Sequence, residues 1–178
     1  MTKQPSSARA DARGLRVILL RSTFNASVVD GLLAGARDEL RAMGAREADV
    51  TVADVPGAFE LPLAAAAAAG SGRFDAIVAL GAVIRGETDH YEHIAREAAR
   101  GLAAVARESG VPVAFGVLTV TEVAQARARS APGPKNKGAE AARAAVVTAR
   151  LVESLRGPRR RPRRAPRRRA ARRSGKSV

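Results

Sequence analysis

The sequence has 178 residues, a length typical of one domain, and 46% of them are apolar although only 3% are aromatic. It contains no cysteine, which excludes disulfides and thiolate catalysis and favours a reducing compartment such as the cytoplasm. Residues 1–13 contain no apolar stretch of the kind a secretory signal requires, and the apolar run at residues 61–69 is too short for a membrane span, so neither is expected.

A formal net charge of +14 would suit a nucleic-acid-binding protein, but the charge is concentrated near one end. Residues 156–176 contain eleven Arg, one Lys and no acid, whereas the rest of the chain holds 19 basic and 17 acidic residues. Composition therefore predicts an N-terminal arm (residues 1–13), a folded region (14–156) and a Pro-interrupted, Arg-rich tail (157–178). The arm and the tail are expected to be disordered, because polar or highly charged segments cannot bury a core.

Short apolar runs alternate with amphipathic stretches along the folded region. The first run, LRVILL at residues 15–20, is rich in branched residues, as buried parallel strands are. Asn25 then stands as a helix N-cap before apolar residues at helical spacing, and Gly44 ends that pattern. Further strands are expected over residues 50–55, 74–83 and 112–119, and further helices over residues 59–69, 89–109, 122–129 and 137–155.

This alternation predicts an α/β fold, a flavodoxin-like three-layer sandwich whose four-stranded parallel sheet has helices on both faces. In such folds ligands bind beyond the carboxyl ends of the strands. The candidate site therefore lies in the segments around these ends, which are residues 21–25, 55–60, 81–90 and 115–121.

Three of the four phenylalanines, Phe24, Phe59 and Phe115, fall in these segments, whereas Phe74 at a strand start is expected in the core. All four could be core residues, but three at the ligand edge of an aromatic-poor protein favour stacking on a planar heterocycle. Glu60 follows Phe59 and could accept hydrogen bonds from ligand hydroxyls. The alternative for Glu60 is an acidic residue favoured by the dipole in the first turn of a helix.

Residues 81–91 (GAVIRGETDHY) lead from a strand through a short loop into a helix whose N-cap is Thr88 or Asp89. Asp89 and Glu92 have the spacing of a capping box. The amides at such a helix start form an anion site, with phosphate as the usual ligand. His90 lies in the first turn, where the helix dipole disfavours the imidazolium, so we expect a neutral imidazole that can accept a proton.

The other histidine, His93, is expected at the surface or at an interface. A metal site formed by His90 and His93 is disfavoured, because HYEH matches no recognised ligand spacing and the chain has no cysteine. The loop before the last helix carries Arg129, Lys135 and Lys137. A guanidinium there can grip a phosphate through two parallel hydrogen bonds, and the alternative is a solvated basic loop.

Together these segments resemble the lumazine synthase family over about residues 14–156. The matches are TFN (residues 23–25), VPGAFELP (55–62), LGAVIRGETDHYEHI (80–94), VPVAFGVLT (111–119) and NKGAEAA (136–142), in the family's order and spacing. The resemblance implies a riboflavin-pathway transferase that condenses 5-amino-6-(ribitylamino)uracil with 3,4-dihydroxy-2-butanone 4-phosphate. The products are 6,7-dimethyl-8-ribityllumazine, phosphate and water, and neither a metal nor an organic cofactor is implied.

The resemblance also implies a role for each matching residue. Phe24 stacks on the pyrimidine, and Glu60 binds ribityl hydroxyls within a wall shared with Ala58 and Phe59. His90 is the acid–base group for imine formation and phosphate elimination. Backbone groups at the end of the third strand face the pyrimidine, from Ala82, Val83 and Ile84. The phosphate is held by a helix start and a guanidinium, from Glu87, Thr88 and Arg129. The remaining contacts come from a neighbouring subunit and from the basic loop, through Phe115 and Lys137.

The implied assembly is a homo-oligomer of pentamers with active sites between subunits. The loop at residues 132–138 has the length found in members that form icosahedral shells, so a shell of pentamers is a further expectation. Thr23 stands where the family usually has Arg, which removes one expected polar contact near the pyrimidine. The loop reads PGPKNKG where the family has a sequence like TKAGNKG, so Gly133 replaces the first lysine and Lys135 follows two residues later.

The Arg-rich tail has no counterpart in the family pattern. Its charges are expected to bind a polyanion, such as nucleic acid or an acidic cargo, and the alternative is a solubilising extension without a partner. Three rival functions stay open. They are a non-catalytic flavin- or lumazine-binding protein of the same fold, an archaeal-type riboflavin synthase, and a protein whose main function is polyanion binding. The rivals are disfavoured by the joint presence of His90 and Arg129, by the GETDHYEHI and NKGAE segments, and by the near-neutral folded region, respectively.

Overall fold

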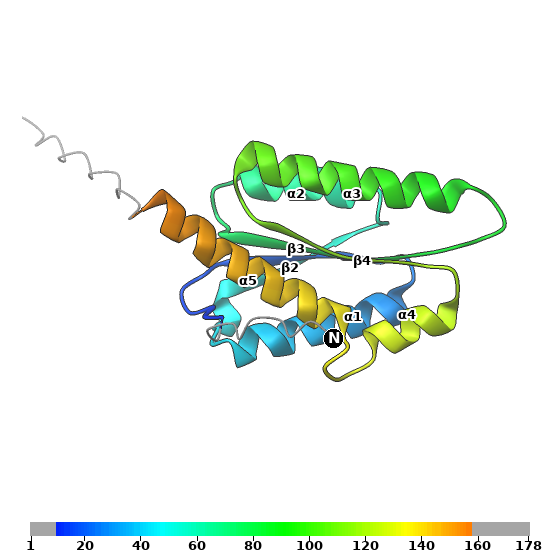
Figure 1. Cartoon of the computed structure of the whole chain (residues 1–178), viewed down its shortest axis with the longest axis horizontal. Coiled ribbons are helices and arrows are strands. Elements are labelled where there is room, and N and C mark those ends of the chain that lie inside the picture. Colours follow the sequence, from blue (N-terminus) through cyan, green and yellow to red (C-terminus); the bar gives the residue numbers. More distant parts are fainter. Residues whose placement is uncertain (1–9, 158–178) are drawn as a thin grey trace, which may run out of the picture.

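A parallel sheet forms the middle layer of the computed structural model, which describes residues 10–157 (Figure 1). Its four strands lie in the order β2-β1-β3-β4, and all neighbours are parallel. The strands are β1 (Val17–Ser22), β2 (Val50–Val55), β3 (Ala76–Ile84) and β4 (Val113–Val120). The expected doubly wound, flavodoxin-like sandwich is confirmed.

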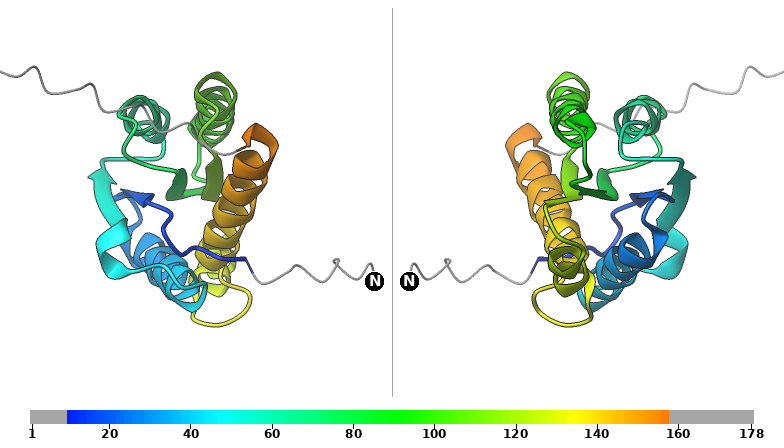
Figure 2. Two further views of the ribbon diagram at one scale, coloured as in Figure 1. Left: turned by 90° about the vertical axis from the view of Figure 1, so that its left-hand side faces the viewer. Right: turned by 90° about the vertical axis from the view of Figure 1, so that its right-hand side faces the viewer.

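Helices cover both faces of the sheet, as an all-parallel sheet requires. The end-on views show helices on either side of the sheet (Figure 2). The first face carries α2 (Leu61–Gly70) and α3 (His90–Ser109), and the second carries α1 (Ala26–Ala42), α4 (Val123–Ser130) and α5 (Lys137–Arg156). A short 3-10 helix, η1 (Glu47–Asp49), precedes β2.

The two faces of the sheet form two separate core clusters. Val17 and Leu19 of β1 pack toward α1 and α5, whereas Ile18 and Leu20 pack toward α2. This alternation follows from the two-residue repeat of a strand. The inner strand β3 is buried along almost its whole length, which explains why its sequence is a continuous apolar run.

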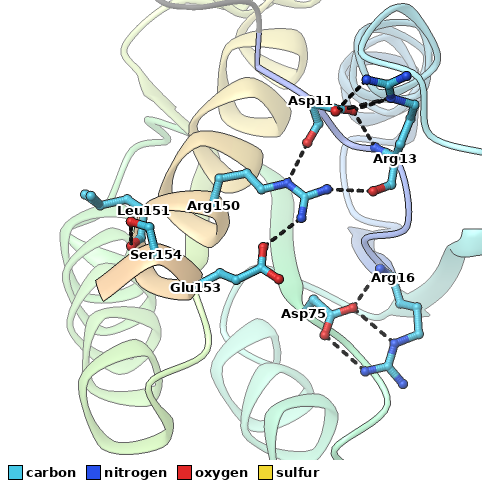
Figure 3. Close-up of polar contacts among 8 residues, drawn as sticks. All are labelled: Asp11, Arg13, Arg16, Asp75, Arg150, Leu151, Glu153 and Ser154. Atoms are coloured by element: carbon cyan, nitrogen blue, oxygen red, sulfur yellow. Dashed lines mark hydrogen bonds and ion pairs between the residues drawn. The ribbon is translucent and has the colours of Figure 1, made fainter. Parts of the chain in front are cut away.

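The N-terminal residues 10–13 are ordered, unlike the arm expected from the sequence. Ala12 is fully buried, and its N–H donates to the Met43 carbonyl at 2.9 Å. Arg150 of α5 donates to the carbonyl oxygens of Asp11 at 2.9 Å and Arg13 at 2.6 Å (Figure 3). The prediction was wrong here because one distant arginine satisfies the backbone, which local composition cannot reveal. The rest of the arm and the tail from residue 158 onward lie outside the described residues.

The chain leaves β1 in one direction and β3 in the other. After β1 it runs through α1 to β2, and after β3 it runs through α3 to β4 on the opposite side. This divergence opens a crevice at the carboxyl ends of β1 and β3, where ligands bind in doubly wound folds. None of the helices within residues 10–157 has the length and apolar character needed to cross a membrane.

Candidate active site

A pocket of about 810 Å³ lies at the carboxyl ends of β1, β2 and β3. We call it the ring pocket. It gathers nine residues predicted from the sequence, which come from the corners after β1 and β2, from the end of β3 and from the start of α3. They are Phe24, Ala58, Phe59, Glu60, Ala82, Val83, Ile84, Thr88 and His90.

Two phenylalanine rings stand at the ring pocket with most of their surface uncovered. Phe24 is 68% exposed and Phe59 is 57% exposed, whereas Phe74 is only 7% exposed and belongs to the core, as expected. Phe24 is held by backbone hydrogen bonds that continue the pairing of β1 and β2, from its own N–H to Pro56 O at 3.1 Å and from Thr23 N–H to Val55 O at 2.9 Å. Rigidly presented, uncovered aromatic faces are suited to stacking on a planar ligand.

Asn25 ties the corner after β1 to the end of β3. It occupies the N-cap position of α1, but its backbone is left-handed (φ 59°) and its side chain does not cap the helix. Instead, Nδ2 donates to Ala82 O at 2.9 Å. The expected capping role is therefore wrong. The pairing of β1 with β3 ends at Arg21 and Leu80, and beyond that point the Asn25 amide links the two segments instead.

The backbone of β3 offers hydrogen-bonding groups at the pocket floor. Arg85 N–H donates to Val120 O of β4 at 2.9 Å. Because successive residues of a strand point their backbone groups to opposite edges, the groups of Val83 also face β4, whereas those of Ala82 and Ile84 face the open edge. Val83 therefore meets the pocket through its side chain, and Ala82 and Ile84 are the residues whose backbone can face a ligand.

Two polar side chains of the ring pocket have no partner within residues 10–157, whereas Glu97 in the same pocket forms an ion pair with Arg100 at 3.8 Å. Neither the Glu60 carboxylate nor the His90 imidazole forms a hydrogen bond or an ion pair there. The capping box expected at α3 does not form, because Asp89 is the N-cap residue with a helical backbone and its side chain accepts no hydrogen bond. No side chain within residues 10–157 caps this first turn; Glu92 N–H donates to Asp89 O at 2.9 Å, and the N–H groups of His90 and Tyr91 are left to bind an anion.

A second pocket, of about 390 Å³, lies along the outer edge of β4. It shares no lining residue with the ring pocket, and it brings together three predicted residues: Phe115, Arg129 and Lys137. We call it the cation pocket. Phe115 lies within β4, as the strand expected over residues 112–119 implies, and its ring is 44% exposed on the sheet edge. Glu87 is exposed in the β3–α3 loop and lines neither pocket.

One face of α3 contributes further residues that the sequence analysis did not assign to the site. Tyr91, His93, Ile94 and Glu97 line the ring pocket beside His90. His90, His93, Ile94 and Glu97 recur at the three- and four-residue steps of one helix face, a signal that was present in the sequence. Among residues 10–157, no group of three or more His, Asp or Glu side chains is arranged to hold a metal ion.

Thr23, at the position where the family usually has arginine, makes a hydrogen bond within the site. The Thr23 hydroxyl donates to Pro56 O at 3.3 Å, next to the backbone bond that positions Phe24. The short side chain therefore contributes to holding the β1 and β2 corners together.

Comparison with known proteins agrees with the geometry. The family model for 6,7-dimethyl-8-ribityllumazine synthase matches residues 14–153. A protein of that name from Nitrosomonas europaea is 50% identical over 145 residues, which cover 82% of this chain and 86% of the relative. Proteins of the same name from Nitratidesulfovibrio vulgaris strains DP4 and Miyazaki F are 46% identical over 145 residues, which cover 82% of this chain and 93% of each relative. The similarity thus spans both pockets.

Proposed function

The chain belongs to the 6,7-dimethyl-8-ribityllumazine synthase family, and from this premise we propose how its two pockets share the reaction. It is a transferase-type condensing enzyme of riboflavin biosynthesis. It joins 5-amino-6-(ribitylamino)uracil to 3,4-dihydroxy-2-butanone 4-phosphate and releases phosphate and water. The observation that carries the assignment of residues is the ring pocket, which combines uncovered aromatic faces with an unpartnered carboxylate and imidazole.

The ring pocket binds the pyrimidine in this proposal. Phe24 stacks on the ring, backbone groups of Ala82 and Ile84 hydrogen-bond to its edge, and Glu60 accepts hydrogen bonds from the ribityl hydroxyls. Ala58 and Phe59 complete the wall, and the Val83 side chain fills the floor. Phe24 supplies apolar contact, and the few polar groups fix the orientation, which is the usual division of work in a small-molecule site.

His90 moves protons in this proposal. When the pyrimidine amine attacks the ketone, His90 accepts the proton that the amine loses and returns it to the hydroxyl that leaves as water. In the elimination it takes the proton from the carbon beside the imine while the C–O bond to phosphate breaks. Thr88, Glu87 and the uncapped amides of α3 lie at the loop end nearest to this chemistry, and they meet the phosphate.

The cationic side chains that bind the phosphate come from a second copy of the chain. Arg129, Lys137 and Phe115 lie at the outer edge of β4 and share no pocket with His90, so one chain alone does not bring phosphate ligand and base together. The exposed face of α5 beside this edge is apolar at Val147, Leu151 and Leu155, which are 43%, 55% and 77% exposed. An uncovered apolar stripe favours a protein interface. We infer a homo-oligomer of pentamers, and the loop at residues 132–138 favours a shell of pentamers.

Mixed oligomers test the shared site. His90→Ala impairs the ring pocket and Arg129→Ala impairs the cation pocket, so each homo-oligomer is expected to be poorly active. If the site combines two copies, co-assembly of equal amounts regenerates an intact site at about a quarter of the interfaces. Activity near one quarter of wild type supports the proposal. Activity equal to the mean of the two variants contradicts it, because both pockets would then act within one chain.

A second function is proposed for the Arg-rich segment at residues 158–178, which holds ten Arg, one Lys and no acid. The described region, residues 10–157, has 18 basic and 17 acidic residues and is nearly neutral. α5 ends at the amino edge of the sheet, on the side opposite the β3–α3 loop (Figure 1), and there Arg156 donates to Gly110 O at 2.9 Å. The segment has no aromatic residue to anchor a protein interface, so we infer that its partner is a nucleic-acid phosphate backbone.

Deletion of residues 158–178 tests this second function. Turnover is expected to stay unchanged, whereas salt-sensitive retention on single-stranded DNA is expected to disappear, because counterion release drives such binding. A variant with every Arg of the segment changed to Lys is the matched control and should retain DNA. Unchanged retention after deletion would refute the proposal, as would stronger binding to polyglutamate than to DNA.

A further inference from the structure

Asn136 is a fully buried polar residue between the two cations of the cation pocket. It lies in the α4–α5 loop, directly before Lys137, and it is 2% exposed. Arg129 lies near the other end of the loop, one residue before the end of α4. The reaction steps described above give Asn136 no role. Burial of an amide is costly unless its hydrogen bonds are made inside the protein, so the partners of this side chain need an explanation.

Both ends of the Asn136 side chain are used in hydrogen bonds. Oδ1 accepts from Gly138 N–H at 2.9 Å and Ala139 N–H at 3.1 Å, which caps α5. Nδ2 donates to three carbonyl oxygens, those of Gly31 and Ser130 at 2.9 Å and that of Ala131 at 3.1 Å. One side chain therefore joins the start of α5, the end of α4 and the middle of α1.

Glycines allow this close approach. A Cβ at Gly35 would lie 2.2 Å from Asn136 Oδ1, and a Cβ at Gly31 would lie 2.5 Å from Ser130 O. Gly31 and Gly35 are four residues apart and thus share one face of α1. A Cβ at Gly138 would lie 1.9 Å from Leu32 O, so α5 also depends on glycine where it crosses α1. The surroundings of the amide are thus fixed by backbone, which cannot yield as a side chain can.

We propose that Asn136 is a positioning residue that sets the separation of Arg129 and Lys137 and thereby the affinity for the sugar phosphate. This inference rests on the proposed role of Arg129. Between the tied ends, Pro132, Gly133, Pro134 and Lys135 are exposed, and a Cβ at Gly133 would meet nothing within 4 Å. We call the hydrogen bonds of Asn136 to α1, α4 and α5 the Asn136 clamp. Because the clamp holds both ends of the loop, these four residues can depart from the family pattern without moving the two cations.

Steady-state kinetics on Asn136→Ser test the proposal, since serine keeps the capping acceptor but removes the amide donors. We expect the KM for the sugar phosphate to rise about tenfold and the KM for the pyrimidine to change by less than about twofold, because a displacement of about 1 Å can cost on the order of 100-fold. Gly35→Ala presses on the clamp from α1 and should have the same selective effect, even if Asn136→Ser does not fold. Pro134→Ala, in the same loop, is the matched control and should leave both KM values unchanged.

A double-mutant cycle separates positioning from general weakening of the fold. In an Arg129→Ala background, Asn136→Ser should add little to the KM for the sugar phosphate, because the separation of the two cations that Asn136 sets is already lost with Arg129. Additive effects, or equal rises in both KM values, would overturn the inference. If Arg129→Ala itself has no selective effect, the proposed role of Arg129 fails instead, so the two failures are distinguishable.

Discussion

Removal of the amide of Asn25 tests how the ring pocket is assembled. The bond from Nδ2 to Ala82 O is 2.9 Å long and partly buried. A hydrogen bond of this kind contributes about 1 kcal/mol net, and water entering the open pocket can solvate the freed carbonyl. We therefore expect Asn25→Asp, which tolerates the left-handed backbone as Asn does, to lower the free energy of unfolding by about 1–2 kcal/mol.

Asn25→Ala loses the same bond and also places alanine at φ 59°. The left-handed conformation costs a residue with a Cβ about 1–2 kcal/mol, so this variant should lose about 2–4 kcal/mol in total. Urea denaturation measures both values, and kinetics should show a larger rise in KM for the pyrimidine than for the sugar phosphate, because Phe24 adjoins Asn25. If Asn25→Asp unfolds at the wild-type midpoint, the bond contributes nothing. If both variants lose the same amount, the argument from the left-handed backbone is wrong.

Three further predictions concern α3 and the N-terminal segment. His90→Ala should lower turnover by about 100- to 10,000-fold with pyrimidine binding retained, whereas His93→Ala, on the same helix face, should have a much smaller effect; equal losses of kcat would remove the acid–base role from His90. Gly101→Ala places a Cβ 2.7 Å from Pro62 Cβ and should destabilise the fold by about 1 kcal/mol or more in thermal denaturation. Gly70→Ala is the control, because a Cβ there meets no described atom within 4 Å, and it should be neutral or stabilising. Equal melting temperatures of the two variants would refute the close packing of Gly101 on Pro62. Hydrogen bonds from the Arg13 side chain and backbone lower the pKa of Asp11 from 3.8 to about 2. They therefore stabilise the fold above pH 3.8, and this stabilisation is lost as the pH falls toward 2. The difference in urea midpoint between wild type and Asp11→Ala should shrink over that range, and a constant difference would contradict the linkage.

The strand pattern predicted the fold well because the burial of each strand can be inferred from its own residues. The branched runs of β1 and β3 are apolar on both faces, as strands between two helical layers must be. This pattern is local, so no contact between distant segments had to be known. The edges of elements were less predictable. Residues 59 and 60 were expected in a helix, but α2 begins at Leu61, because the corner after β2 presents Phe59 and Glu60 to the pocket.

Hydrogen bonds between distant segments were invisible in the sequence. Asn25 and Asp89 both have the residue type of a helix cap, yet neither caps its helix with its side chain, and Asn25 binds the end of β3 instead. Asn136 does cap α5, but its second role depends on carbonyl groups of α1 and α4 that no local pattern connects. The ligand edge itself was predictable, since strand ends meet at one edge whatever their side chains. The division of the candidate site into two pockets was implied only by the family resemblance, because it depends on where β4 lies in the sheet, which no residue pattern in the chain reveals.

The condensation itself is the most direct test of the account. Purified full-length protein is mixed with 5-amino-6-(ribitylamino)uracil and 3,4-dihydroxy-2-butanone 4-phosphate, and lumazine absorbance and released phosphate are recorded together. Both signals are expected to increase at the same rate, with one phosphate per lumazine, and both rates should fall in parallel in His90→Ala. Binding of the pyrimidine without acceleration of either signal would contradict the account and would identify a binding protein that has kept the ring pocket but does not catalyse the condensation.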